Sequence, residues 1–285
     1  MAITIKNLKF TYMTGSPYEK DALKDINITI DDGEAIGIIG HTGSGKSTLV
    51  QHLNGILMAS SGSINISGIE VSQKNIKEIR KQVGLVFQYP EHQLFEETVF
   101  KDIGYGLIKQ GYEEKYIEEK VLNTIKIIGL NKNLLEKSPF NLSGGEKRKV
   151  AIAGVLAMSP KILVLDEPAA GLDPKGRDEV YDAIIKYKKE NNATLILVSH
   201  SMEDLARCVG RIIVLNKGRI QMDGTLSEVF QNDEMLNKIG LSIPQITYFM
   251  RLLRERIPAL SAEAFTVNEA KDIILSYLRR GQYHD

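Results

Sequence analysis

Nine residues, 40–48, constrain the fold of this chain more than any other feature of its sequence. They match the pattern G-x-x-x-x-G-K-[ST], follow a near-continuous apolar run at residues 34–40 and precede a segment with helical spacing. Glycines at these positions let successive backbone N–H groups point at a phosphate, in the positive field of the following helix. A strand, such a loop and a helix, in that order, predict a nucleoside-triphosphate site in an α/β fold.

Two polar residues of this loop have predicted roles. Lys46 places a mobile positive charge on the β- and γ-phosphates, and the Ser47 hydroxyl is a ligand for Mg²⁺. A glycine-rich turn with a chance lysine is the ordinary alternative, and the flanking strand and helix disfavour it. The candidate nucleotide-binding residues of the loop are Gly40, His41, Thr42, Gly43, Ser44, Gly45, Lys46, Ser47 and Thr48.

A second candidate element is the run KILVLDEP at residues 161–168. Four apolar residues deliver Asp166 to the carboxyl end of a buried strand, which is where open α/β sheets bind ligands. An aspartate there holds Mg²⁺, and the adjacent Glu167 polarises an attacking water. Without a phosphate loop, a strand that simply ends in two solvated acids would be the favoured interpretation. Beside a complete phosphate loop, the pair predicts a hydrolytic centre.

The order of the remaining segments predicts the architecture. Buried strands expected at residues 161–166 and 194–199 alternate with helical segments, which favours a parallel sheet with helices on its faces. Short alternating strands in the opening part predict an antiparallel β subdomain, and the helical character of residues 89–155 predicts an insertion. We therefore expect an α/β nucleotide-binding domain at residues 1–238 and a small helical extension at residues 239–285.

Composition limits the partners and the compartment. Lys and Arg total 36, as do Asp and Glu, so the formal charge is zero, which argues against nucleic acid as the main partner. The single cysteine, Cys208, offers neither an internal disulfide nor a metal cluster, which fits a reducing cytosol. The apolar run at residues 150–158 is half the ~18 residues that a bilayer requires. We therefore expect membrane association only through a partner.

Further motifs identify the class of NTPase by resemblance. LSGGE at residues 142–146 resembles the signature sequence of ATP-binding-cassette (ABC) ATPases. VFQ, ending in Gln88, resembles their Q-loop, and VSH, ending in His200, resembles their switch histidine. The order and spacing match that family from about residue 3 to residue 235. By this resemblance the signature comprises Leu142, Ser143, Gly144, Gly145 and Glu146, the D-loop comprises Gly171, Leu172 and Asp173, and Tyr12 stacks on adenine.

Some of these residues also have ordinary alternative roles. Ser143 and Glu146 form the S-x-x-E pattern of a capping box, and a capped helix N-terminus is also a good anion site. His200 alone is typical of a satisfied histidine at a strand end, and Gln88 alone is an ordinary polar residue. Tyr12 is also a candidate for the core, because Phe10 lies on the same strand face by the period of two.

The resemblance to ABC ATPases implies a mechanism. Two such domains pack head to tail and hold two ATP molecules, each between one phosphate loop and the LSGGE of the other domain. Glu167 is the general base, and His200 contacts the γ-phosphate. Gln88 joins Ser47 and Asp166 at the Mg²⁺ ion. Hydrolysis removes the γ-phosphate that holds the dimer closed, which couples a conformational change to a partner.

The segment after Phe87 makes the resemblance to ABC ATPases more specific. QYPEHQLFEETV, at residues 88–99, is similar to the FQ-x-P-x-x-QLF-x-x-TV pattern of energy-coupling-factor (ECF) transporter ATPases, which drive bacterial uptake of vitamins and of cobalt or nickel ions. Residues 14–23, 39–57 and 151–177 resemble the second (A′) ATPase of ECF modules. A hydrophobic and acidic loop at a helix start is the ordinary alternative. Its place directly after the Q-loop, where ABC domains receive a coupling helix, favours the transporter.

The ECF resemblance implies ATP and Mg²⁺ as cofactors and a set of membrane partners. These are a second ECF-type ATPase, a transmembrane scaffold that docks its coupling helices at residues 89–99, and small substrate-binding membrane proteins contacted indirectly. The chain would lie peripherally at the cytoplasmic face of the cell membrane. Its C-terminal helices would help to hold the ATPases together, although a private core would use their apolar stripes equally well. The residues to test there are Ile243, Tyr248, Phe249 and Leu253.

Two alternatives stay open. One is a dedicated cobalt or nickel importer ATPase that acts as a homodimer. The other, from a different class, is a soluble ABC regulator or a nucleic-acid-linked ATPase. Translation factors of this class usually carry two cassettes and repair ATPases a long coiled coil, and this sequence has neither pattern. Charge changes at Glu96 and Glu97 would uncouple ATP hydrolysis from transport in a transporter and have no effect in a soluble regulator.

Overall fold

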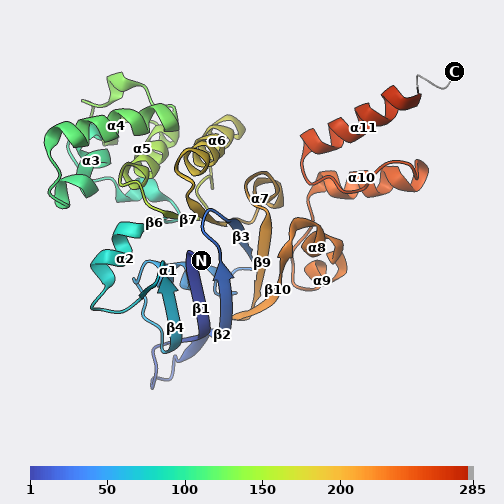
Figure 1. Cartoon of the computed structure of the whole chain (residues 1–285), viewed down its shortest axis with the longest axis horizontal. Coiled ribbons are helices and arrows are strands. Elements are labelled where there is room, and N and C mark those ends of the chain that lie inside the picture. The colour runs from blue at the N-terminus through green and yellow to red at the C-terminus, as the bar shows by residue number, and fades with distance from the viewer. Residues whose placement is uncertain (282–285) are drawn as a thin grey trace.

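The structure is a computed structural model that describes residues 1–281 of the 285-residue chain. A six-stranded sheet forms its centre, and a four-stranded sheet lies over one face with a helix between them. Other helices cover the opposite face, and two helices extend from the body at the C-terminal end (Figure 1). This arrangement confirms the predicted α/β class, with a parallel core, an antiparallel β subdomain, a helical insertion and a helical extension.

The central sheet sets the position of the candidate site. Its strands are β3 (Ala35–Ile39), β6 (Val83–Val86), β7 (Ile162–Asp166), β8 (Thr194–Val198), β9 (Arg211–Asn216) and β10 (Arg219–Thr225). They lie in the order β10-β9-β3-β8-β7-β6, all parallel except the edge strand β10. Every residue of β6, β7 and β8 is buried, because layers cover both faces, and their sequences are therefore continuously apolar. The segments that follow the parallel strands meet at one edge of this sheet.

The antiparallel sheet consists of β1 (Ile3–Tyr12), β2 (Lys20–Ile30), β4 (Ser61–Ile66) and β5 (Ile69–Glu70), in the order β2-β1-β4-β5. In β1, Ile3 pairs with Ile30 on one side and with Ile66 on the other, and all three side chains are buried. These residues share one apolar cluster with Ile38 and other residues of the central sheet. The antiparallel sheet is therefore packed firmly over the start of the phosphate loop.

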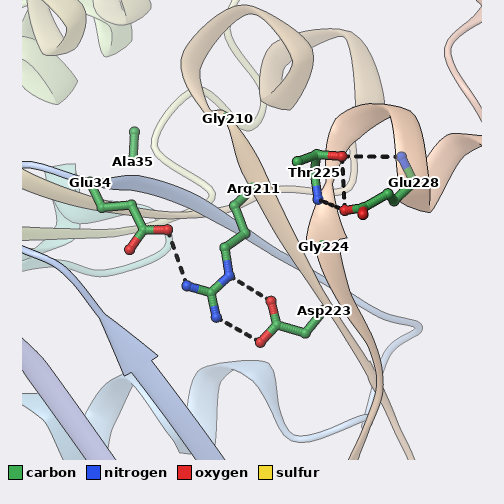
Figure 2. Close-up of a pocket in the computed structure, with 8 residues that line it drawn as sticks. All are labelled: Glu34, Ala35, Gly210, Arg211, Asp223, Gly224, Thr225 and Glu228. Carbon is green, nitrogen blue, oxygen red and sulfur yellow. Dashed lines mark hydrogen bonds and ion pairs between the residues drawn. The ribbon is translucent and has the colours of Figure 1, made fainter.

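Arg211, at the start of β9, joins the two sheets (Figure 2). Its Nε and Nη2 donate to the two carboxylate oxygens of Asp223 on β10, at 2.6 and 2.7 Å. Its Nη1 donates to Glu34 Oε1 at 3.1 Å and to the Thr29 carbonyl of β2 at 2.9 Å. Each hydrogen-bonding edge of the guanidinium thus meets an acceptor from a different segment, which ties β2, β9 and β10 together.

The helices divide into a group on the central sheet and a group at the C-terminal end. The first group comprises α1 (Lys46–Leu53), α2 (Ile76–Gln82), α3 (Val99–Lys109), α4 (Glu114–Ile128), α5 (Gly144–Ala157), α6 (Pro174–Asn191), α7 (Met202–Cys208), α8 (Leu226–Gln231) and α9 (Asp233–Lys238), with short 3₁₀ turns η1 (Pro90–Gln93), η2 (Lys132–Leu134) and η3 (Pro139–Asn141). The predicted insertion corresponds to α3, α4 and α5, whose apolar faces share one cluster with the sheet.

The C-terminal group consists of α10 (Gln245–Arg256) and α11 (Val267–Gly281). Their own small apolar cluster contains Met250, Ala264 and Ala270, and the pair projects from the body of the molecule (Figure 1). α9 ends at the predicted domain boundary after residue 238, and the last four residues of the predicted extension lie outside the described residues. No helix within residues 1–281 is long and apolar enough to cross a membrane.

Candidate active site

The phosphate loop links β3 to α1, and its backbone path depends on glycine. A Cβ atom on Gly40 would lie 2.3 Å from the Leu215 carbonyl oxygen, and one on Gly45 would lie 2.8 Å from the Ala22 carbonyl oxygen. Gly45 also has a φ of +109°, a left-handed conformation that side chains disfavour. The loop therefore winds tightly between the two sheets, and the helix that follows begins at Lys46.

Lys46 is 7% exposed and reaches back across its own loop. Its Nζ donates to the Gly40 carbonyl at 2.7 Å and to the His41 carbonyl at 3.2 Å. Burial lowers the pKa of Lys46, whereas the charges of Asp166 and Glu167 act in the opposite direction. The ammonium group is thus held at the base of the loop, facing the two carboxylates that end β7.

Asp166 and Glu167 stand at the end of β7 as predicted. Burial raises the pKa of Asp166, while a hydrogen bond from Ser47 and the charge of Lys46 oppose the shift. Burial, followed by the charge of Asp166, raises the pKa of Glu167 to about 7. Glu167 also has a φ of +53°, in the left-handed region that costs a non-glycine residue about 1–3 kcal/mol. Such a strained acid with a pKa near neutrality is suited to accept a proton.

His200 lies next to Glu167 at the end of β8. Its Nε2 is 3.6 Å from Glu167 Oε1, an oxygen that is buried and has no hydrogen-bond partner in the described structure. The His200 side chain is 53% exposed, and burial together with the charge of Lys46 lowers its pKa. A neutral imidazole therefore faces the unpaired carboxylate oxygen from the solvent side.

One cleft of about 310 Å³ is lined by half of the predicted site residues. The loop contributes Thr42, Gly43 and Gly45 to Thr48, and the strands and the segments directly after them contribute Tyr12, Gln88, Asp166, Glu167 and His200. Two lining residues of β2, Lys20 and Ala22, were not predicted, because no motif marks them. The signature residues 142–146 and the D-loop residues 171–173 do not line this cleft. Three larger clefts, of about 410, 560 and 1050 Å³, contain no residue of the phosphate loop.

Tyr12 forms one wall of the cleft. It is 37% exposed, and its hydroxyl lies 3.1 Å from the Thr48 hydroxyl. Phe10 packs edge to face against both Tyr12 and His52, with ring centroids 4.7 Å apart in each case. The β1–β2 register shifts between Phe10 and Thr11, yet the two rings stay on one face of the strand. Of the two aromatic candidates, Tyr12 lines the cleft and Phe10 packs toward the core.

The signature segment starts α5. Ser143 accepts a hydrogen bond from the Glu146 backbone N–H at 3.4 Å, and Glu146 Oε2 accepts from the Ser143 N–H at 2.9 Å. This confirms the predicted capping box. Leu142 is buried beneath it, whereas Gly144 is exposed and Gly145 is half-buried. The N-terminus of α5 therefore presents Gly144 to the surface.

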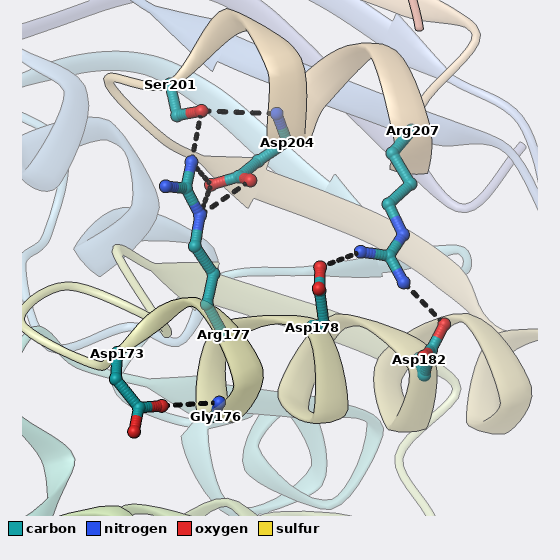
Figure 3. Close-up of polar contacts among 8 residues, drawn as sticks. All are labelled: Asp173, Gly176, Arg177, Asp178, Asp182, Ser201, Asp204 and Arg207. Atoms are coloured by element: carbon teal, nitrogen blue, oxygen red, sulfur yellow. Dashed lines mark hydrogen bonds and ion pairs between the residues drawn. The ribbon is translucent and has the colours of Figure 1, made fainter. Parts of the chain in front are cut away.

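The D-loop segment leads into α6 and is tied to the switch region (Figure 3). Asp173 caps α6 by accepting from the Gly176 N–H at 2.7 Å. Arg177, one turn further, donates from Nε to both oxygens of Asp204, at 2.8 and 3.0 Å. Its Nη2 donates to the hydroxyl of Ser201, the neighbour of His200. The D-loop helix and the switch histidine segment are thus joined through one guanidinium group.

The oxygen atoms that could act as metal ligands in the cleft fit a magnesium ion bound together with a nucleotide. Ser47 offers a hydroxyl, Asp166 a carboxylate and Gln88 an amide oxygen, and Mg²⁺ prefers such oxygen ligands. Within residues 1–281 no group of three or more His, Cys, Asp or Glu side chains could hold a metal alone. In proteins, one or two carboxylates and substrate phosphates commonly share a Mg²⁺ ion. Fold and cleft together define the chain as a nucleotide-binding α/β protein of the P-loop class.

Comparisons with known proteins agree with this class. The ABC transporter family profile matches residues 23–170. The energy-coupling factor transporter ATP-binding protein EcfA2 of Acetivibrio thermocellus is 56% identical over 280 residues, spanning 98% of this chain and 100% of that protein. The protein of the same name from Clostridium perfringens is 52% identical over 98% of this chain and 99% of its own length.

Solved structures agree as well. The structure of cbiO1 from Clostridium perfringens, described as part of the ABC transporter complex cbiONQ, has a TM-score of 0.74 and 38% identity. It covers 88% of this chain and 98% of its own. A dimeric ATP-binding cassette in a post-hydrolysis state, bound to ADP and Pi, has a TM-score of 0.71 and 28% identity over 78% of this chain and 98% of its own.

The chain belongs to the ABC transporter family, in the branch of the energy-coupling factor transporter ATP-binding proteins. It is an ABC ATPase, and the predicted resemblance to the second ATPase of ECF modules is confirmed. The names of these relatives do not favour a dedicated metal importer or a soluble regulatory ATPase.

Proposed function

We propose that this chain forms one half of an ATPase pair that powers an ECF-type importer of micronutrients. The observation that carries the proposal is the division of the site within one chain. Lys46, Asp166, Glu167 and His200 converge on one cleft, whereas the signature helix begins at the surface, outside that cleft. This division supports head-to-tail pairing, in which each ATP lies between the cleft of one ATPase and the signature of the other.

The proposed chemistry starts from the buried carboxylate. Glu167 accepts the proton of the attacking water, and its pKa of about 7 matches that task at neutral pH. His200, whose Nε2 lies 3.6 Å from Glu167 Oε1, would orient the water and contact the γ-phosphate. The loop N–H groups and Lys46 bind the phosphates, and Tyr12 stacks on adenine. Mg²⁺, held by Ser47, Asp166 and Gln88, would neutralise the charge that develops between the β- and γ-phosphates.

The proposed contribution of the signature is made to the opposite ATP. The N-terminus of α5 carries a partial positive charge, and its capping box fixes the direction of that helix end. The exposed Gly144 and the half-buried Gly145, which carry no side chain, would allow a phosphate of a second molecule to approach the backbone. Asp173 and the D-loop would lie at the same interface.

The proposed partners follow from the exposed surface of residues 89–99. Phe95 and Tyr89 are 57% and 46% exposed, and Glu96 and Glu97 lie beside them. Such an apolar and acidic surface suits a coupling helix of a transmembrane scaffold, with small substrate-binding membrane proteins beyond it. The chain would then lie at the cytoplasmic face of the membrane. On α10, the exposed Tyr248 and Phe249 support a contact with the second ATPase.

A tagged pull-down from gently solubilised native membranes tests this proposal, with co-purifying proteins identified by mass. We expect a second, similar ATPase, a hydrophobic scaffold and several small membrane proteins. Recovery of this ATPase alone with one dedicated permease would instead indicate a homodimeric importer. Recovery of soluble partners only would refute the transporter assignment and leave an ABC ATPase of another role.

A further inference from the structure

Arg148, in the second turn of α5, is the most completely buried arginine of the described chain outside the nucleotide cleft. The residue is 2% exposed, and the side chain of its ion-pair partner, Glu91, is 17% exposed. Sequence motifs gave no indication of it, because Arg148 lies beyond the LSGGE pattern and Glu91 lies 57 positions earlier in the chain. A buried charged pair of this kind requires a close match between the groups that meet there.

Four hydrogen bonds hold the Arg148 guanidinium. Nε and Nη2 donate to the two oxygens of Glu91, both at 2.6 Å. Nη1 donates to the Pro168 carbonyl at 3.1 Å and to the Ala170 carbonyl at 2.8 Å. The group also lies over the Tyr89 ring, 5.7 Å from its centroid. Only the planar fork of arginine can serve all these acceptors at once.

Each contact belongs to a different part of the machinery. Glu91 lies in η1, three residues after Gln88 and inside the proposed docking segment 89–99. Pro168 directly follows the proposed general base Glu167, which is in the left-handed conformation, and Ala170 directly precedes the D-loop. Arg148 itself belongs to the helix that the signature starts. The Arg148 side chain, which belongs to α5, thus contacts both the docking segment 89–99 and residues 168–170 beside Glu167.

We propose that Arg148 is a positioning residue that transmits docking of the membrane partner to the ATP site. The inference rests on the proposed function, because it requires a partner at residues 89–99. A shift of η1 on docking would move Glu91, and the bidentate pair would carry Arg148 and the start of α5 with it. The two carbonyl contacts would pass the same shift to the segment that holds Glu167 and the D-loop.

A neighbouring ion pair offers a matched control. Lys149 Nζ binds Glu179 Oε2 at 2.5 Å, with side-chain exposures of 12% and 42%. This pair joins the same helix, α5, to α6, but it is a single contact and touches neither η1 nor residues 168–170. Substitution of Lys149→Met therefore removes a comparable ion pair from the same helix without altering the contacts of Arg148.

The test uses the purified transporter complex and compares the ATPase activity with and without the membrane partner. For Arg148→Lys we expect the ATP KM to stay within about twofold, while the stimulated kcat falls about tenfold or more, since small misplacements of catalytic groups have large effects. Arg148→Lys lies outside the docking segment, so it changes no surface that the partner contacts. Lys149→Met should retain the stimulated kcat within about twofold.

A double variant, Glu91→Gln with Arg148→Met, separates positioning from stability. It removes both buried charges, so no unpaired charge remains and the fold is expected to be retained, as a melting curve will show. We expect the complex to assemble, to bind ATP as the wild type does, and to lack stimulation. Wild-type stimulation in this variant or in Arg148→Lys would overturn the inference. Equal losses in Lys149→Met would overturn it too, because they would indicate a general effect on α5. If no membrane partner co-purifies with the wild-type chain, the proposed function fails, and this inference fails with it.

Discussion

Two helix N-termini of this molecule are built from glycine-rich loops, yet they serve opposite purposes. At the start of α1, no side chain caps the helix among the described residues, and Lys46 is buried beside Asp166 and Glu167. At the start of α5, a complete capping box fixes the helix end, and Gly144 faces the surface. The first end is completed by its own chain. The second lies at the surface, where we propose that it contacts the ATP bound by a second molecule.

The two helix ends predict which substitutions should affect the ATP of the same chain and which should affect the ATP of the partner. Residues around α1 share one cleft, so their loss should affect the ATP bound by the same chain. Residues at the start of α5 should affect the ATP of the partner. Residues of the C-terminal helices should affect pairing alone. The expected effects below are ordered from the largest to the smallest.

Substitution of Lys46→Ala should have the largest effect. It removes the only ammonium group among the lining residues of the loop, and we expect ATP affinity to fall about 100-fold and hydrolysis at least about 1000-fold. Equilibrium binding of a fluorescent ATP analogue and steady-state phosphate release measure the two losses. Lys9→Ala, an exposed change on β1, is the control and should leave both unchanged. Retained ATP affinity in Lys46→Ala would contradict the account of the loop.

Substitution of Glu167→Gln should come next. Loss of the general base should lower kcat about 100-fold to 1000-fold while ATP binding stays within about threefold, and the variant should accumulate as a closed dimer with ATP. The wild-type kcat should rise with pH through the Glu167 pKa of about 7, and the residual activity of the variant should not. Phosphate release between pH 5.5 and 8.5, a range chosen to bracket that pKa, checks both statements. Wild-type turnover in Glu167→Gln would show that another group is the base.

The same substitution should also change stability, with a sign set by the pKa. The Glu167 pKa is raised from 4.5 to about 7 in the fold, so the protonated form stabilises the protein below pH 4.5 and this stabilisation is lost as pH rises through 7. Glutamine cannot ionise. The free energy of unfolding of Glu167→Gln, relative to that of the wild type, should therefore be about 1–3 kcal/mol higher at pH 8 than at pH 4.5. Urea unfolding without nucleotide measures this difference. A larger gain in the free energy of unfolding at pH 4.5 than at pH 8 would contradict the raised pKa of Glu167.

A change on α10 should have the smallest effect. Phe249 is 49% exposed, and Phe249→Asp should weaken pairing of the two ATPases about threefold to tenfold, with ATP affinity unchanged. Analytical ultracentrifugation of the ATPase pair measures the pairing. Lys271→Asp, an exposed change on α11, is the control. If Phe249→Asp leaves pairing intact, the apolar stripe of α10 belongs to the small core of the extension instead.

The sequence was informative where local chemistry decides the structure. The phosphate loop, the Asp166–Glu167 pair and the capping box of Ser143 each depend on residues close together in the chain, and the structure contains all three. Their catalytic roles stay predictions. The contacts of Arg148 and Arg177 were not foreseen, because their partners lie 20 to 57 positions away and no periodic pattern marks them.

Strand β1, which bears Phe10 and Tyr12, shows a second reason why the sequence did not predict every residue of the site. A period of two places both aromatic rings on one face of the strand, where they pack against each other, but only Tyr12 lines the cleft. Lys20 and Ala22 line the cleft for a related reason, since the antiparallel sheet lies over the loop only after folding. Motifs thus predict the chemistry of the site, and packing decides which neighbours complete it.

The central claim, that each ATP is shared between the cleft of one ATPase and the signature of the other, is tested most directly with Ser143→Arg. This chain carrying Ser143→Arg would be paired with its wild-type partner ATPase and labelled with a photoreactive azido-ATP under trapping conditions. The label reports the chain whose phosphate loop holds the nucleotide, and the two chains are separated by mass. The account predicts loss of trapped label on the partner and retention on this chain. Loss on this chain, with the partner unaffected, would contradict it.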